Sequence, residues 1–148
     1  MGKLHQGEFK PKHPEKYKGK FPIIYRSSWE LKFMHELDDR PDVVYWSSES
    51  VIVQYFHPYK RRLARYFPDF LVAFKNKEGK IDRWLVEVKP YRETIPPITK
   101  KRQRSTTKLY QEATYKVNTQ KWEAAEKYCK DNGLRFKLIT EKELYKYK

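Results

Sequence analysis

Two apolar runs separated by a short polar turn constrain the fold of this chain more than any other feature. The runs, residues 65–74 and 82–89, are rich in aromatic and β-branched side chains. The turn between them, residues 75–80, contains lysine, asparagine and glycine. This pattern predicts an antiparallel β-hairpin. A hairpin symmetric about the turn places Asp69 opposite Glu87 to within about one residue, with their Cβ atoms roughly 4.5–5.5 Å apart.

The side chains of this hairpin alternate between two faces, and both faces are largely apolar. Residues two apart in a strand share a face, so Glu87 and Lys89 point the same way as Asp69. Leu71 and Leu85 accompany them. The opposite face is entirely apolar: it carries Phe70, Val72, Phe74, Trp84, Val86 and Val88. We therefore expect a central pair of strands that is covered on both sides.

Charged groups set into such a hairpin require a partner. A buried carboxylate becomes protonated, paired or metal-bound, because burial alone is too costly for the charged form. Carboxylate oxygens are the ligands that Mg²⁺ prefers, and one or two of them are usual. A metal there would activate water and neutralise charge on a phosphate, while Lys89 would orient the nucleophile or stabilise the transition state. The pattern favours phosphodiester chemistry, although a Pro-Asp pair alone also marks turns and Glu-x-Lys also occurs on solvated strands.

Pro68-Asp69 followed by Glu87-Val88-Lys89 resembles the Pro-Asp…(Asp/Glu)-x-Lys signature of the restriction-endonuclease-like nuclease superfamily. The resemblance extends over roughly residues 21–147. It implies an α/β fold, with a mixed sheet flanked by helices, and metal-dependent endonuclease activity on double-stranded DNA.

The same resemblance assigns roles to individual residues. It implies that Asp69 and Glu87 bind Mg²⁺, with Mn²⁺ as the alternative, together with the Val88 carbonyl. It implies that Lys89 positions or activates the attacking water. No small-molecule cofactor is expected.

Glu30 is the further acidic candidate. A helix is predicted from Ser27 to about residue 39, and Glu30 lies in the middle of its apolar stripe. The other members of the stripe are Trp29, Phe33, Met34 and Leu37. Ser27-x-x-Glu30 fits a capping box, which is the structural alternative. The resemblance implies instead that Glu30 holds a second metal ion or the hydration shell of the first.

The rest of the chain predicts further strands and helices around the hairpin. Strands at 43–46, 51–56 and 134–139 would complete a sheet of about five. Helices are expected at 105–115, with Leu109 and Ala113 inward, from 118 or 119 to 131, and after Thr140. Cys129 is expected to be a core residue.

The charge of the chain indicates a polyanionic partner. Its 148 residues include 33 Lys and Arg against 19 Asp and Glu, a net charge of +14. Nucleic acid is the usual partner of such a domain, although ribosomal and membrane-binding proteins share the property. The candidate DNA-binding residues are Lys60, Arg61, Arg62, Arg65, Lys100, Lys101, Arg102 and Arg104, with a solvated loop as the alternative for each cluster.

Domain organisation and location follow from the remaining composition. Residues 1–20 are rich in Lys, Pro, Gly and His and are predicted to be a flexible basic arm, with 21–148 as one nuclease-like domain. His5 and His13 in that arm are expected to be solvated. The single cysteine excludes an internal disulfide, and no apolar run approaches membrane length. We expect a protein of the cytoplasm, or of a particle assembled there.

Within the superfamily the chain resembles two groups, the head-completion nucleases of T4-like tailed phages and the endonuclease subunits of heteromeric bacterial transposases. The residues that suggest both are Ser28-Trp29-Glu30, Phe67-Pro68-Asp69-Phe70, Val86-Glu87-Val88-Lys89, Tyr128-Cys129 and Thr140-Glu141-Lys142-Glu143-Leu144. The short length favours the phage group, which implies a late step of head assembly, phage head or neck proteins as partners, and location in the host cytoplasm and virion. A non-catalytic DNA-binding head or neck protein and an RNA-binding ribosomal-type protein are the alternatives.

Overall fold

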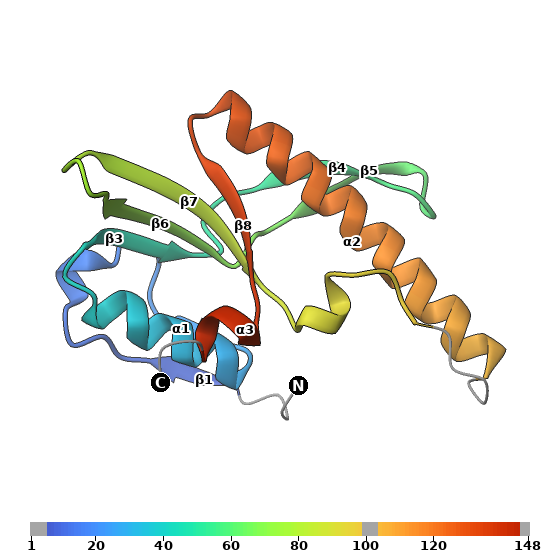
Figure 1. The fold of residues 1–148 in the computed structure, drawn as a ribbon, viewed down its shortest axis with the longest axis horizontal. Coiled ribbons are helices and arrows are strands. Elements are labelled where there is room, and N and C mark those ends of the chain that lie inside the picture. The colour runs from blue at the N-terminus through green and yellow to red at the C-terminus, as the bar shows by residue number, and fades with distance from the viewer. Residues whose placement is uncertain (1–5, 99–103, 146–148) are drawn as a thin grey trace.

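The computed structural model describes residues 6–98 and 104–145 (Figure 1). Its elements are strands and helices, with five consecutive strands between the first two α-helices. In order they are β1 (Gly7–Phe9), η1 (Pro14–Lys16), β2 (Ile23–Tyr25), α1 (Ser28–Asp39), β3 (Val43–Ser48), β4 (Val53–His57), β5 (Arg62–Tyr66), β6 (Phe70–Lys75), β7 (Ile81–Val88), η2 (Tyr91–Glu93), α2 (Ser105–Asp131), β8 (Arg135–Ile139) and α3 (Glu141–Leu144).

The main sheet of the described residues is mixed, as predicted, and has four strands in the order β3-β6-β7-β8. Neighbouring strands β3, β6 and β7 are antiparallel, and β8 runs parallel to β7. The parallel connection passes through α2, as a βαβ unit requires. The expected fifth strand, residues 51–56, is instead β4, which pairs with β5 in a separate hairpin.

The two faces of the sheet bury different clusters, and the predicted alternation is confirmed. Phe70, Val72, Val86 and Val88 pack in a cluster that includes residues of α1 and α3. Leu71 and Leu85 belong to a second cluster, formed with α2 and the β4–β5 hairpin. The ribbon shows α1 and α3 on one side of the sheet and α2 with the hairpin on the other (Figure 1). The central strands are therefore covered on both sides.

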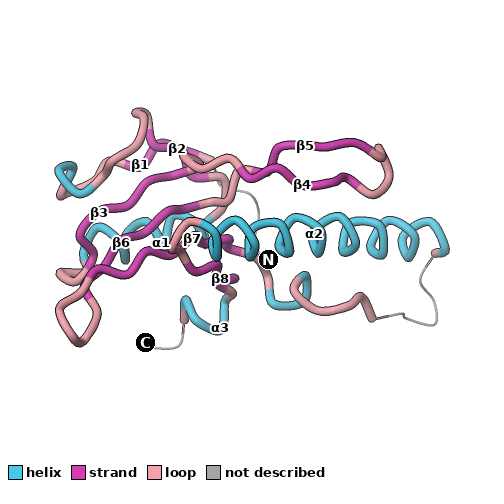
Figure 2. The backbone as a smooth tube through the Cα atoms, turned by 90° about the horizontal axis from the view of Figure 1, so that it is seen from above, coloured by secondary structure: helices cyan, strands magenta, loops and turns pink. Residues whose placement is uncertain are grey.

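Helix α2 is continuous over 27 residues, so the prediction of two helices at this place was wrong. Its N-terminal half extends beyond the main sheet alongside the β4–β5 hairpin (Figure 2). Leu109, predicted to point inward, is 66% exposed for this reason. Despite its length α2 is polar, and no helix of the described residues is both long and apolar enough to cross a membrane.

The N-terminal segment differs from the predicted flexible arm. Residues 1–5 lie outside the described residues, but β1 pairs with β2, and Phe9 and Tyr17 are buried in the cluster beneath α1. Aromatic rings supply this burial in a segment with almost no aliphatic side chains. The expected domain boundary at residue 20 therefore does not hold.

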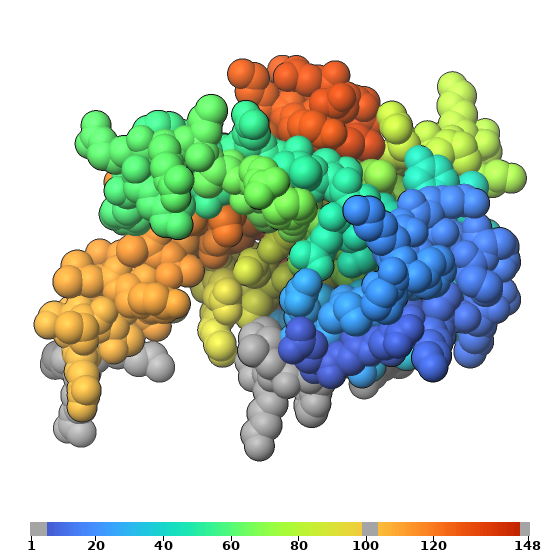
Figure 3. All heavy atoms as spheres, turned by 180° about the vertical axis from the view of Figure 1, so that it is seen from behind, coloured from blue at the N-terminus to red at the C-terminus, as the bar shows by residue number. Residues whose placement is uncertain are grey.

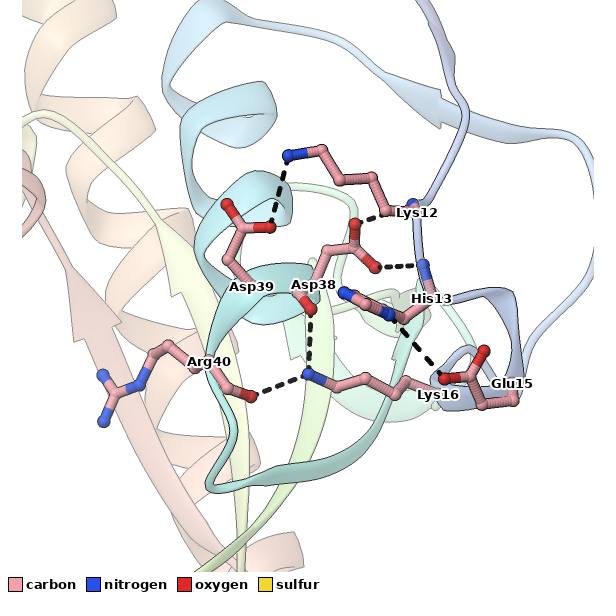
Figure 4. Close-up of polar contacts among 7 residues, drawn as sticks. All are labelled: Lys12, His13, Glu15, Lys16, Asp38, Asp39 and Arg40. Atoms are coloured by element: carbon pink, nitrogen blue, oxygen red, sulfur yellow. Dashed lines mark hydrogen bonds and ion pairs between the residues drawn. The ribbon is translucent and has the colours of Figure 1, made fainter.

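Asp38, at the end of α1, fastens this segment to the domain (Figure 4). Asp38 is 1% exposed, and its carboxylate accepts hydrogen bonds from the backbone N–H groups of Lys12 (2.8 Å) and His13 (3.1 Å). The Lys16 ammonium donates to the backbone carbonyls of Asp38 (2.9 Å) and Arg40 (2.7 Å). Because a buried carboxylate needs such donors, these contacts fix the path of the segment across the helix end.

Candidate active site

The pairing of β6 with β7 brings Asp69 and Glu87 together as predicted. Phe70 lies opposite Val86, so one step along each strand places Asp69 opposite Glu87. The carboxylate of Asp69 accepts a hydrogen bond from the Val88 backbone N–H at 2.8 Å. This bond fixes the orientation of the Asp69 side chain across the strand pair.

Glu87 is buried, at 6% exposure. The hydroxyl of Tyr66 donates a hydrogen bond of 2.8 Å to its Oε1. The Nζ atom of Lys89 lies 3.6 Å from its Oε2. The Lys89 side chain is 29% exposed, whereas that of Glu87 is almost fully covered.

Electrostatics disfavour the charged forms of the two carboxylates. Burial, followed by the neighbouring charges of Glu87 and Glu30, raises the pKa of Asp69 well above its usual range. Burial also raises the pKa of Glu87, and the Lys89 ammonium and the Tyr66 hydroxyl only partly offset it. A pair of carboxylates held together in this way is stabilised by a bound cation, because opposite charge favours their ionised forms.

Glu30 approaches this pair from the start of α1. Its Oε1 accepts a hydrogen bond of 3.0 Å from the Arg26 backbone N–H, while its own N–H donates to the Ser27 hydroxyl at 3.1 Å. This is half of the expected capping box, with the return bond made to Arg26 in place of Ser27. Burial raises the pKa of Glu30, and the charges of Glu49 and Glu87 raise it further. Glu30 thus serves the helix start and also lies within electrostatic reach of the pair.

The donor set fits a hard divalent cation held by two carboxylates. Among residues 6–98 and 104–145, no three His, Cys, Asp or Glu side chains converge on one point as a metal cluster would. Glu30 is therefore not brought into a common ligand set with Asp69 and Glu87. Two carboxylates are nonetheless sufficient for Mg²⁺, which usually fills its remaining positions with water and substrate oxygens.

The structure adds two residues that the sequence analysis missed, Tyr66 and Lys121. Tyr66 is buried and reaches Glu87 from β5, a strand that was not predicted. Lys121 lies on α2, with its ammonium 5.5 Å from the centre of the Tyr66 ring. A signal for Lys121 was present, since it follows the buried Asn118 by three residues and precedes the buried Ala125 by four, and so lies on the inward stripe of the helix.

The basic candidates lie around the site rather than within it. Lys60, Arg61 and Arg62 are exposed at the turn of the β4–β5 hairpin, the end far from Tyr66. Arg65 is also exposed, with its guanidinium 5.9 Å from the centre of the Phe67 ring. Arg104 caps α2 and is exposed, whereas Lys100, Lys101 and Arg102 lie outside the described residues.

The space-filling view shows how these parts surround the end of β7 (Figure 3). The residues that follow β7, coloured yellow, lie between the green hairpin, the orange helix α2 and the blue N-terminal part. The carboxylates of Asp69 and Glu87 belong to this end of the sheet.

Comparison with known proteins agrees with the resemblance read from the sequence. The family described as TnsA-like endonuclease N terminal matches residues 40–141, a range that contains Asp69, Glu87 and Lys89 but not Glu30. The chain is also 34% identical over 144 residues to the head completion nuclease of Enterobacteria phage T4, covering 93% of this chain and 91% of that protein.

Proposed function

Because the chain belongs to the TnsA-like N-terminal endonuclease family, we propose that this nuclease is a Mg²⁺-dependent DNA endonuclease whose reacting centre contains Asp69, Glu87 and Lys89. The observation that carries the proposal is the pair of facing carboxylates, each with a raised pKa, beside a lysine whose Nζ lies 3.6 Å from Glu87. Carboxylates whose pKa values are raised by burial and by each other are typical of a functional site.

Each residue has a task that follows from its contacts. Mg²⁺, or Mn²⁺ in its place, bound by the two carboxylates would activate water and neutralise charge on the phosphate. The Val88 N–H orients Asp69, and the Tyr66 hydroxyl orients Glu87. Lys89, whose Nζ lies 3.6 Å from Glu87, would hold the attacking water and donate a hydrogen bond to the phosphate. The water oxygen would bond to phosphorus and release its proton to bulk water. The phosphorus–oxygen bond to the leaving strand would break, and the leaving oxygen would take up a proton from water.

We assign Glu30 a supporting role at this centre. Its carboxylate is tied to the Arg26 N–H, which keeps it near the pair without joining it. From there Glu30 would accept hydrogen bonds from water bound to the cation, and so order the hydration shell.

Double-stranded DNA is the proposed substrate. The net charge of +14 supports binding to a polyanion through counterion release. Exposed Lys60, Arg61, Arg62, Arg65 and Arg104 would contact backbone phosphates, and Lys100, Lys101 and Arg102 are proposed to act with them.

The biological step is proposed from the phage relative. That protein is a head completion nuclease, and its similarity spans nearly all of both chains. We place this chain at the same step, in the host cytoplasm and the virion, with phage head or neck proteins as further partners. The transposase-type alternative, an endonuclease subunit that cuts DNA ends, is favoured by the matching family.

The first experiment is a cleavage assay on linear and supercoiled double-stranded DNA in Mg²⁺, in Mn²⁺ and in EDTA. Lys89→Ala tests the centre, and Lys75→Ala, at the opposite end of the hairpin, is the matched control. We expect cleavage only with a divalent metal, by the wild type and Lys75→Ala but not by Lys89→Ala. Cleavage in EDTA, or by Lys89→Ala at the wild-type rate, would contradict the proposal.

DNA binding without cleavage in either metal would point to a different role. The same assay on DNA-filled, tailless phage heads would then separate an activity that needs the assembled particle from a structural head or neck function.

A further inference from the structure

Lys121 connects α2 with the carboxylate centre. Its ammonium lies 5.5 Å from the centre of the Tyr66 ring and 5.8 Å from that of Tyr55. The hydroxyl of the same Tyr66 donates the 2.8 Å hydrogen bond to Glu87. One tyrosine therefore contacts a buried carboxylate at its tip and a lysine at its face.

The charge of Lys121 is not balanced by an ion pair. In the part of the chain that the structure describes, no carboxylate lies within salt-bridge distance of its ammonium. The side chain is half-buried, and a buried ammonium is costly unless its three donors find acceptors. Two tyrosine faces supply part of the compensation. The three N–H donors of the ammonium remain open to solvent or to a bound ligand.

The ammonium of Lys89 adds a second positive charge near Lys121. Burial lowers the pKa of Lys121, and the nearby charge of Lys89 lowers it further, while Glu87 acts in the opposite direction. Lys89 lies on β7 and Lys121 on α2, so the two ammonium groups approach the centre from different elements. An anion that contacts both would relieve their repulsion.

We propose that Lys121 binds a non-bridging oxygen of the phosphate that reacts at this centre, as a second cation beside Lys89. The inference rests on the proposed function and deepens it. Lys121 forms no covalent bond and transfers no proton. It donates hydrogen bonds to the phosphate, and these strengthen as charge builds on the oxygens in the transition state.

The rival explanation is that Lys121 only fastens α2 to the β4–β5 hairpin. The chain offers a matched control for this role, because Lys116 on the same helix lies 5.8 Å from the centre of the Tyr59 ring in the same hairpin. Lys116 makes the same kind of contact about 7.5 Å farther along the helix axis, at 1.5 Å per residue. Lys116→Met and Lys121→Met each remove one such contact and retain the apolar stem.

The test measures cleavage and binding separately. Cleavage of supercoiled plasmid is followed in Mg²⁺ at saturating protein, for the wild type, both methionine variants and Lys121→Arg. We expect Lys121→Met to cleave about 10²-fold more slowly, as when a donor to the transition state is lost. Lys116→Met should cleave at a rate within about threefold of the wild type, because its cation–π contact with Tyr59 contributes to the stability of the fold and not to the reaction. Lys121→Arg should recover part of the rate, because it keeps the charge.

Binding of a short fluorescent DNA duplex in EDTA gives the readout that does not need cleavage. Lys121→Met should lower the slope of log affinity against log salt by about one, as for the loss of one phosphate contact. Rates and slopes for Lys121→Met that equal those of Lys116→Met, with equal losses of melting temperature, would overturn the inference and leave a structural contact. A wild type that binds DNA but cleaves it neither in solution nor on filled, tailless heads would refute the proposed function, and the salt slope would then decide the role of Lys121 alone.

Discussion

Asp38 and Asp69 are both shielded from solvent, but the surroundings of their carboxylates differ. Asp38 is 1% exposed, and its carboxylate accepts two backbone hydrogen bonds from the N-terminal segment (Figure 4). Asp69 accepts one backbone hydrogen bond and faces the charges of Glu87 and Glu30.

Asp38 therefore stabilises the fold, whereas Asp69 is available to bind a cation. The chain itself completes the hydrogen bonds of Asp38, so that carboxylate stabilises the native state as it stands. Asp69 and Glu87 repel each other, so their charged forms are favoured only when a cation joins them. Loss of Asp38 should therefore reduce stability, and loss of Asp69 should reduce activity.

The largest effect is expected for Asp69→Asn. The amide oxygen retains an acceptor for the Val88 N–H but removes the negative charge. We expect cleavage in Mg²⁺ to fall about 10²–10³-fold, the usual cost of losing a group that stabilises the transition state electrostatically. Urea unfolding in EDTA should show a stability equal to or above that of the wild type. A variant that cleaves normally, or one that unfolds far more easily, would remove the contrast with Asp38.

The next largest effect is expected for Asp38→Ala. The backbone N–H groups of Lys12 and His13 would lose the acceptor of their part-buried hydrogen bonds, which costs about 1–3 kcal/mol of unfolding free energy. The control is Asp39→Ala, because Asp39 is exposed and makes a 3.8 Å surface ion pair with Lys12. Urea unfolding measures both variants, and the folded Asp38→Ala protein should cleave DNA at the wild-type rate. Equal stabilities for the two variants would show that Asp38 does not anchor the segment.

A smaller effect is expected from Mg²⁺ itself. An ion that binds only the folded state at ten times its dissociation constant raises the unfolding free energy by about 1.4 kcal/mol. The melting temperature of the wild type and of Asp39→Ala should therefore rise with Mg²⁺, and that of Asp69→Asn should not. An equal rise in all three proteins would place the binding of the ion elsewhere.

The smallest effect is a pH dependence of stability in EDTA. Because the pKa of Asp69 is raised in the folded state, its contribution to stability is complete below its unfolded pKa of about 3.9. That contribution is lost as the pH rises through the folded pKa. The melting temperature of the wild type minus that of Asp69→Asn should therefore decrease from about pH 4 to pH 7. A difference that is constant or increases with pH would contradict the raised pKa.

The features predicted best from the sequence are those encoded by neighbouring residues. The turn at 75–80 and the flanking apolar runs determine the β6–β7 register, and the register brings Asp69 and Glu87 together. The start of α1 was likewise predicted from Ser27 and the stripe that follows it.

The hairpin β4–β5 was missed because its turn lacks the residue that usually marks one. Arg61 adopts a positive φ of 51° there, a conformation for which glycine is the common choice. The run of basic residues before Ala64 concealed the alternation of Ala64 and Tyr66, and with it the partner of Glu87.

The remaining errors arose from tertiary contacts that no local pattern contains. Asn118 and Thr119 suggested a helix start, but Asn118 is buried within α2 and the Thr119 hydroxyl donates to the Tyr115 carbonyl one turn earlier. The donors to Asp38 are backbone N–H groups, which carry no sequence signature. Lys121 reaches the centre only because α2 crosses the hairpin.

The continuity of α2 also sets a length scale for the substrate. From Arg104 to Lys121 the helix advances about 25 Å, at 1.5 Å per residue. Along one DNA strand that distance corresponds to about seven nucleotides at 3.4 Å each. If Arg104 and Lys121 bind phosphates as proposed, with α2 along the duplex, the protein would therefore shield about seven nucleotides on one side of the cut.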